Sequence, residues 1–305
     1  MIKFDQISIC LGKKKLKNSL IEKEFNLKKN SIFEKTGIQS RYISNSKQTS
    51  EQIAISCVKK IRKKFLNNIT HILSVSNTPS YAFPSVAHFI ASFLNFKNNN
   101  INCIGLNSGC SGYVDALSMC HDIILSNKSA KILLTTSDTY SKFIRKKDKY
   151  IKCLFSDGGS ASIISYSKNG WKVKKKFSQT LPNSQKFLKM NNLNKNENFI
   201  SMDGPEIVKF ALTNVIPKLK EFSRGNTKTI LIHQAGKVVM DLVLNSINKD
   251  KKIYIPTNYK DYGNLISTSI PLVFYKNFKK ILSSKSIVLC GFGVGLTHSY
   301  MKLEK

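Results

Sequence analysis

The segment around Cys110 joins two stretches of opposite hydrophobic period, and it limits the possible folds more than any other part of the chain. Residues 101–106 alternate as a strand does, whereas apolar side chains recur at helical spacing in residues 113–125. A small-residue turn, residues 107–112, lies between them and carries Cys110. A cysteine at a helix N-terminus has its thiolate stabilised and its thiol pKa lowered by the helix dipole. We therefore expect Cys110 to be a nucleophile.

The same alternation of strand and helix runs along the whole chain, which is typical of an α/β protein. Each half contains a strand that ends in a small-residue turn, one at Cys110 and the other at residues 291–295. We therefore expect two similar halves, residues 1–168 and 169–305. Strands are expected at residues 2–11, 71–76, 131–137, 161–166, 229–232 and 286–290, and helices at 51–66, 86–94, 205–222, 237–247 and 269–281. The lysine- and asparagine-rich residues 172–198 are expected to be an irregular surface excursion.

The charge is strongly basic, with 49 Lys and Arg against 18 Asp and Glu and a net charge of +31. The lysines are spread along the chain, and no RNA-binding aromatic signature or zinc motif accompanies them. We therefore expect no nucleic acid partner. An acidic protein or a phosphorylated cofactor accounts for the sign of the charge better.

The seven cysteines are odd in number and lack the spacing of metal ligands, which indicates free thiols in a reducing compartment. No apolar run is long enough to span a bilayer, and the N-terminal residues lack the apolar region of a signal peptide. We expect a cytoplasmic protein with no membrane partner and no metal.

Two residues of the second half are candidate partners for Cys110. His233 directly follows the strand expected at residues 229–232, so its ring is expected to project from a strand end. Asn264 follows Gly263, a pattern that either forms a turn before a helix or directs an amide into a pocket.

Together Cys110, His233 and Asn264 resemble the Cys-His-Asn centre of β-ketoacyl-acyl-carrier-protein synthase III, in the thiolase superfamily. Five further segments resemble motifs of that family and follow its order along the chain: residues 35–41, 82–85, 154–159, 202–210 and 291–297. The resemblance implies a five-layered αβαβα fold and an acyl transfer from acyl-CoA to Cys110, followed by decarboxylative condensation with a malonyl group on an acidic carrier protein. It implies acyl-CoA as a substrate and no permanently bound cofactor.

The resemblance also implies roles for other residues. The backbone N–H groups of Cys110 and Val294 would hold the oxyanion, and His233 Nε2 and the Asn264 amide would donate to the enolate oxygen. His298 and Phe83 are assigned to the acyl pocket, Phe83 to that of the partner in a homodimer. Contacts to CoA or the carrier protein are assigned to four basic residues: Lys35, Arg41, Lys149 and Lys237.

Several positions depart from the family pattern. Ser31 stands where a tryptophan is usual, Lys35 and Lys149 where arginine is usual, and Val294 where the loop has a glycine. Two functions other than that of a condensing enzyme therefore remain as alternatives. One is an acyltransferase of the same fold that acylates an oxygen or nitrogen nucleophile in a specialised pathway, and the other is a non-catalytic partner subunit.

Overall fold

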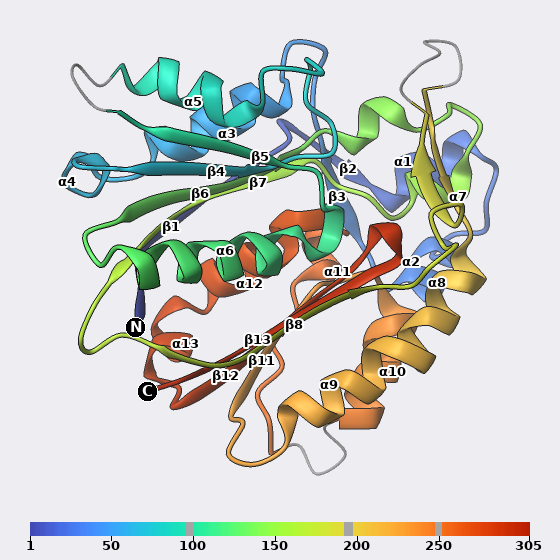
Figure 1. Ribbon diagram of the computed structural model, residues 1–305. Coiled ribbons are helices and arrows are strands. Elements are labelled where there is room, and N and C mark those ends of the chain that lie inside the picture. The colour runs from blue at the N-terminus through green and yellow to red at the C-terminus, as the bar shows by residue number, and fades with distance from the viewer. Residues whose placement is uncertain (96–99, 192–197, 248–251) are drawn as a thin grey trace.

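The computed structural model describes residues 1–95, 100–191, 198–247 and 252–305, and these form five layers (Figure 1). Helices α3 (Ser50–Lys59) and α5 (Val86–Leu94) cover the outer face of one sheet, and α9 (Ile216–Ser223) and α10 (Lys237–Ile247) cover that of the other. Helices α6 (Gly112–Ser126) and α12 (Ser269–Lys276) lie between the two sheets. The five-layered αβαβα arrangement is thus confirmed.

The first sheet has the strand order β1-β7-β6-β4-β5. Its strands are β1 (Ile2–Leu11), β4 (His71–Val75), β5 (Asn102–Leu106), β6 (Lys131–Asp138) and β7 (Gly158–Tyr166). Strand β4 pairs in parallel with β5 and β6, whereas β7 is antiparallel to β1 and β6. Because β5 and β6 follow β4 through helical crossovers, their carboxyl ends meet at one edge of the sheet, where Cys110 begins α6.

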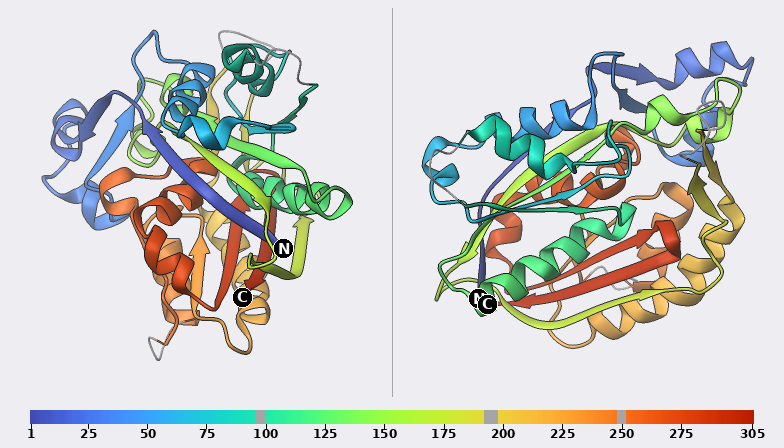
Figure 2. Two further views of the ribbon diagram at one scale, coloured as in Figure 1. Left: turned by 90° about the vertical axis from the view of Figure 1, so that its left-hand side faces the viewer. Right: turned by 45° about the horizontal axis from the view of Figure 1, so that its top comes forward.

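The second sheet has the order β11-β12-β13-β8. Its strands are β8 (Lys172–Thr180), β11 (Thr229–Ile232), β12 (Ser286–Gly293) and β13 (Thr297–Glu304). Strand β11 is parallel to β12, and β13 is antiparallel to both β12 and β8. The views in Figure 2 show this sheet below the central helices, with both chain termini at the same edge of the molecule.

The prediction of an irregular stretch at residues 172–198 was wrong for its first part, because Lys172–Thr180 form strand β8. This strand is an edge strand whose lysines point outward, while Val173 and Phe177 pack inward beside β13. The exposed lysines hide its alternation from a composition-based interpretation. Residues 192–197 lie outside the described part of the chain.

The remaining elements are short. Two small antiparallel pairs are β2 (Lys14–Lys17) with β3 (Ser40–Ile43) and β9 (Leu188–Met190) with β10 (Ile200–Met202). The other helices are α1 (Asn18–Glu24), α2 (Ser31–Thr36), α4 (Lys63–Leu66), α7 (Lys149–Lys152), α8 (Gly204–Phe210), α11 (Tyr259–Tyr262) and α13 (Phe278–Ser283).

Three of the expected helices contain interruptions. The helix expected at 51–66 ends at Lys59 and resumes as α4, and the one expected at 269–281 is divided at Asn277. The helix expected at 205–222 contains a π turn, Ala211–Val215, directly before α9. Pro217 in the first turn of α9 has no N–H to donate, and the wider turn accommodates that loss.

The central helices are apolar on two sides because each faces both sheets. Val114 and Leu117 of α6 and Phe274 of α12 are buried in one core cluster with residues of both sheets, among them Leu134 and Leu289. Burying such a side chain contributes about 1.5–3 kcal/mol each. This core holds α6, and with it Cys110, at the boundary between the sheets. A division of the chain into halves at residue 168 stays our proposal.

Candidate active site

Cys110 lies in a 3-10 turn, Gly109–Ser111, that leads from β5 into α6. Its side chain is buried against the turn between β12 and β13. A Cβ atom built on Gly293 would lie 2.8 Å from Cys110 Cβ and 2.9 Å from Cys110 Sγ, and Gly293 has φ of 156°. This close approach requires a glycine at position 293, because any larger residue would displace the sulfur.

The environment of the sulfur differs from the expectation of a lowered pKa. Burial raises the pKa of the Cys110 thiol to about 12, and the carboxylate of Asp138 adds to the increase. The backbone N–H groups of Val294 and of Cys110 itself act in the opposite direction. Burial raises the thiol pKa by more than the N–H groups at the start of the helix lower it. The free protein therefore holds a neutral Cys110 thiol. The two N–H groups that reach the sulfur are those predicted for the oxyanion.

His233 begins where β11 ends, and its backbone N–H donates to the Cys290 carbonyl at 2.8 Å. Its ring Nδ1 lies 3.1 Å from the carbonyl oxygen of Ile266. Because a carbonyl only accepts hydrogen bonds, Nδ1 carries the hydrogen and Nε2 of the neutral ring is an acceptor. Burial lowers the pKa of His233 to about 4, so the ring is neutral at physiological pH.

Asn264 is held in place by contacts from both halves of the chain. Its backbone N–H donates to Leu154 at 2.9 Å, and its carbonyl accepts from Ser156 at 2.8 Å. Its side-chain Oδ1 accepts from the Ile266 N–H at 2.9 Å. The Nδ2 amide of Asn264 therefore remains available to donate a hydrogen bond to a substrate in the cavity.

Ile266 therefore positions both candidate residues, because its carbonyl fixes the His233 tautomer and its N–H fixes the Asn264 amide. Its φ is 51°, in the left-handed region that a β-branched residue rarely adopts. Such strain costs on the order of 1–3 kcal/mol and tends to persist at functional sites. The sequence analysis missed Ile266, and an isoleucine before a helix gives no signal of this role.

One cavity of about 170 Å³, here called the Cys110 cavity, is lined by Cys110, His233 and Asn264 together. Lys35 and Lys237 also line it. Their contact with CoA or a carrier protein stays a prediction. The rest of its wall is largely apolar and includes Leu154, Phe155, Leu188, Ile207, Val208 and Phe292. An apolar enclosure strengthens hydrogen bonds to a developing charge, because water is excluded.

The structure places the other predicted residues away from this cavity. Arg41 is fully buried, where its Nη2 donates to Asn18 Oδ1 at 2.8 Å, so the predicted contact to CoA or a carrier protein is wrong for this residue. Burial lowers the pKa of Arg41 to about 10. Lys149 is half-buried at the start of α7 and does not line the Cys110 cavity.

His298 and Phe83 lie in opposite environments. His298 is buried among aromatic rings, with its Nδ1 2.9 Å from the Tyr300 hydroxyl and its ring 5.5 Å from that of Phe210. It lines neither the Cys110 cavity nor the second cavity described below. Phe83 is 86% exposed in the loop before α5, as a residue that reaches another subunit would be.

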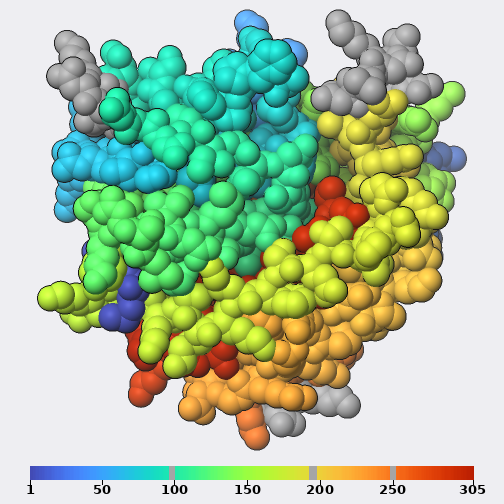
Figure 3. All heavy atoms as spheres, in the orientation of Figure 1, coloured from blue at the N-terminus to red at the C-terminus, as the bar shows by residue number. Residues whose placement is uncertain are grey.

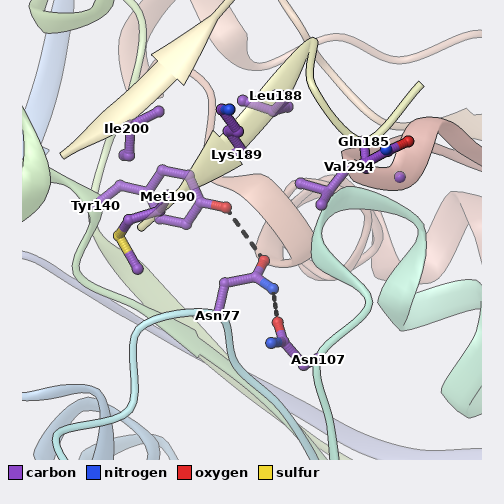
Figure 4. Close-up of a pocket in the computed structure, with 10 residues that line it drawn as sticks. Asn77, Asn107, Tyr140, Gln185, Leu188, Lys189, Met190, Ile200 and Val294 are labelled. Carbon is purple, nitrogen blue, oxygen red and sulfur yellow. Dashed lines mark hydrogen bonds between the residues drawn. The ribbon is translucent and has the colours of Figure 1, made fainter. Parts of the chain in front are cut away.

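A second cavity of about 310 Å³ lies on the other side of Leu188, which lines both (Figure 4). We call it the Asn77 cavity. Val294 connects the two, because its N–H reaches Cys110 Sγ and its side chain lines the Asn77 cavity. The sequence analysis missed this cavity. Its lining is Asn77, Asn107, Tyr140, Gln185, Leu188, Lys189, Met190, Ile200, Val294 and Gly295.

Asp138 is a second residue that the sequence analysis missed. It lies at the end of β6, where its Oδ1 accepts from the Asn77 N–H at 2.7 Å and its Oδ2 accepts from the Ser267 hydroxyl at 3.2 Å. Burial raises the pKa of Asp138 to about 7, although these hydrogen bonds oppose the increase. A carboxyl group with this pKa changes charge near neutral pH, close to the nucleophile.

The described residues contain no group of three or more His, Cys, Asp or Glu side chains that could hold a metal ion. Within the same ranges, no helix has the length and apolar character that crossing a bilayer demands.

Comparisons with known proteins agree with this geometry. The chain matches the family model described as 3-oxoacyl-[acyl-carrier-protein (ACP)] synthase III over residues 104–180 and that of the C-terminal part of the same enzyme over residues 220–304. It is 28% identical to the β-ketoacyl-[acyl-carrier-protein] synthase III of Clostridium tetani, covering 92% of each chain. The corresponding enzyme of Clostridium novyi is 29% identical, with 87% of each chain covered.

Solved structures show the same fold. The 3-oxoacyl-(acyl-carrier protein) synthase of Burkholderia xenovorans superimposes with a TM-score of 0.90 at 21% identity, over 99% of this chain and 93% of that one. The synthase III of Thermus thermophilus gives a TM-score of 0.89 at 20% identity, over 99% and 98%. The fold and the site define a thiolase-like condensing enzyme. Within that class, the chain belongs to the β-ketoacyl-[acyl-carrier-protein] synthase III family, as a divergent member.

Proposed function

We propose that this protein condenses an acyl group, carried on Cys110, with a malonyl group on an acyl carrier protein. The observation that supports this most is the meeting of Cys110, His233 and Asn264 in one buried apolar cavity, with the Val294 N–H at the sulfur. Acyl-CoA supplies the acyl group, and we place the reaction in the cytoplasm.

In the first step the neutral thiol loses its proton to His233 Nε2, which is free to accept it. The Cys110 sulfur attacks the thioester carbonyl of acyl-CoA, and the backbone N–H groups of Cys110 and Val294 stabilise the oxyanion. The bond from carbon to the CoA sulfur then breaks. The departing CoA thiolate takes the proton from His233, so the ring is neutral again when the acyl-enzyme has formed.

In the second step the malonyl group loses CO2, and the electron pair of the broken bond forms an enolate. The Asn264 Nδ2 amide donates to the enolate oxygen. His233 Nε2, expected above as a second donor, holds no hydrogen in the tautomer set by Ile266. It donates only after it has taken up the proton that the overall reaction consumes. The enolate carbon attacks the acyl carbonyl, the Cys110 sulfur leaves, and this proton restores the thiol.

Lysines near the Cys110 cavity are suited to bind the phosphates of CoA and the acidic carrier protein. Lys35 and Lys237 line the cavity, and Lys237 lies at the start of α10. Lys237→Glu is expected to slow the reaction with carrier-bound malonyl several-fold at low salt, and the difference should shrink at high salt. Lys63→Glu, on α4 at the far end of the molecule in Figure 1, serves as the control and is expected to react as the unchanged protein does.

We propose a homodimer in which Phe83 reaches the partner. Phe83 is 86% exposed, and its burial against a second subunit would remove a large apolar surface from water. Light scattering should give about twice the chain mass of 34.4 kDa, and Phe83→Asp should shift the mass toward the monomer. A monomeric unchanged protein would contradict this part of the proposal.

The decisive experiment is intact-mass spectrometry in two stages. Incubation with acyl-CoA should add one acyl group, and Cys110→Ala should prevent it while the other six cysteines remain. Addition of malonyl-carrier protein should then remove the group and release CO2. No adduct with any donor would overturn both enzymatic interpretations and leave the non-catalytic subunit. An adduct discharged only by oxygen or nitrogen nucleophiles would indicate the acyltransferase.

A further inference from the structure

The Asn77 cavity lies within reach of an acyl group on Cys110. Val294 contacts the sulfur through its N–H and the cavity through its side chain. Asn77 Oδ1 would lie 3.1 Å from a Cβ on Gly109, the residue before the nucleophile. The Tyr140 ring, which lines the Asn77 cavity, packs 5.1 Å from that of Phe155, which lines the Cys110 cavity. The two cavities are thus neighbouring arms of one site.

The Asn77 cavity also opens to the surface. In Figure 3 the red atoms of the β12–β13 connection reach the surface between the green and yellow segments. The connection between β8 and β9 is tied to that turn, because the Ser184 hydroxyl donates to the Gly295 carbonyl at 2.7 Å. This contact ties the start of the connection to the turn, and the lining of the cavity includes Gln185 and Lys189 from this part of the chain.

The polar side chains of the cavity form an ordered chain of hydrogen bonds. The Tyr140 hydroxyl donates to Asn77 Oδ1 at 3.1 Å, and Asn77 Nδ2 donates to Asn107 Oδ1 (Figure 4). Each of the two asparagine side-chain oxygens therefore already accepts one hydrogen bond. The group left at the end of the chain is the Asn107 Nδ2 donor.

The remaining polar lining strengthens this donor character. The Lys189 ammonium is a donor only, the Gln185 amide offers both donors and an acceptor, and no carboxylate is among the described residues of the lining. The volume of about 310 Å³ is that of a small-molecule site. Asn107 and Lys189 are exposed in the free protein, so water can hydrogen-bond to them. An unsubstituted alkyl chain would displace this water without replacing its hydrogen bonds, which is unfavourable.

We propose that the Asn77 cavity receives the acyl group and selects short acyl groups that carry a hydrogen-bond-accepting oxygen. The inference rests on the proposed function, because Cys110 delivers the group to the cavity. The oxygen is that of a hydroxyl or of a carboxylate, which both accept from Asn107 and Lys189.

The test compares three four-carbon donors: butyryl-CoA, 3-hydroxybutyryl-CoA and succinyl-CoA. The second-order rate of Cys110 acylation is followed by intact-mass spectrometry. We expect at least one oxygen-bearing donor to react about tenfold faster than butyryl-CoA, as one additional satisfied hydrogen bond allows. A preference for succinyl-CoA that Lys189→Met removes identifies a carboxylate, and a preference for 3-hydroxybutyryl-CoA identifies a hydroxyl.

A matched pair of variants locates the cause of the preference. Asn107→Leu removes the last donor at the carboxyl end of β5, and Asn102→Leu makes the same change at the exposed start of that strand. We expect Asn107→Leu to reduce the ratio of oxygen-bearing to butyryl rates to below about threefold, and Asn102→Leu to leave the ratio as it was. Because the readout is a ratio within one protein, a general loss of activity does not produce it.

The outcomes separate the inference from the proposed function. Butyryl-CoA reacting as fast as both other donors would overturn the inference and leave the condensing function intact. A preference that survives Asn107→Leu undiminished would overturn it as well. No acylation by any donor would overturn the proposed function itself.

Discussion

The Cys110 cavity and the Asn77 cavity share Leu188 and lie on either side of the same turn, yet their walls differ in kind. The wall around Cys110, His233 and Asn264 is largely apolar, and the lysines of the Cys110 cavity are Lys35 and Lys237. The Asn77 cavity carries amides, a phenol and an ammonium group. An apolar wall suits chemistry that must exclude water, whereas a polar wall suits recognition of a particular ligand.

The cavities also differ in how their residues are held. His233 and Asn264 are both fixed by the backbone of Ile266, so their positions depend on a single strained residue. Asn77, Asn107 and Tyr140 are fixed mainly by one another. Substitutions in the Asn77 cavity should therefore alter selectivity, whereas those in the Cys110 cavity should alter the reaction itself.

Gly293→Ala is expected to have a large effect through geometry alone. The new Cβ would overlap the side chain of Cys110, so the sulfur must move away from the Val294 N–H. A displacement of this size costs about 100-fold in the acylation rate. Gly225→Ala is the control, since Gly225 also has positive φ but no atom lies within 4 Å of its added Cβ. Equal acylation rates for the two variants would show that the sulfur does not depend on this approach.

The next effect is that of His233→Ala. Loss of the base should slow acylation about 10²–10⁴-fold at pH 7. Because the pKa of the thiol is about 12, the rate of the variant should rise about tenfold for each pH unit between 7 and 9. The ring of the unchanged protein should cause no inflection near pH 6.5, since the His233 pKa is about 4. Because Asp138 also changes charge near neutral pH, the comparison is made in the Asp138→Asn background, where an inflection near pH 6.5 would mean that the ring is less buried than the structure shows.

The smallest effect is expected from Asp138→Asn. The folded pKa of about 7 lies above the ordinary value of 3.8, so the folded state holds more protons than the unfolded state between about pH 4 and 7. The stability from the protonated carboxyl is therefore present at low pH and is lost as the pH rises through 7. Between pH 5.5 and pH 8.5, the melting temperature of the unchanged protein should fall by more than that of Asp138→Asn. The same fall in both would exclude Asp138 as the cause.

Much of the fold could be predicted from hydrophobic period alone. Strands β1 and β11 and helices α5 and α10 have the expected bounds, because each carries an uninterrupted apolar pattern. Strand β8 and the elements between residues 14 and 36 were missed, since polar side chains occupy most of their positions. At an edge, pairing with a neighbouring strand forms structure that the local pattern does not reveal.

The candidate site divides in a similar way. Cys110, His233 and Asn264 lie beside small-residue turns in an order typical of a family, so the sequence indicates them. Arg41 lies in a comparable motif and yet is buried, because only packing decides where a side chain points. Asn77, Asn107 and Tyr140 come from three separate segments without a motif, so no spacing in the sequence predicts that they meet.

The central claim is that Asn264 serves the condensation, and it can be tested with Asn264→Asp. The aspartate keeps the oxygen that accepts from the Ile266 N–H but replaces the Nδ2 donor. Single-turnover measurements should follow acylation of Cys110 and then CO2 release from malonyl-carrier protein. We predict acylation within about fivefold of the unchanged protein and CO2 release slower by about 10²–10³-fold. Equal losses in both steps, or no loss in CO2 release, would contradict this account.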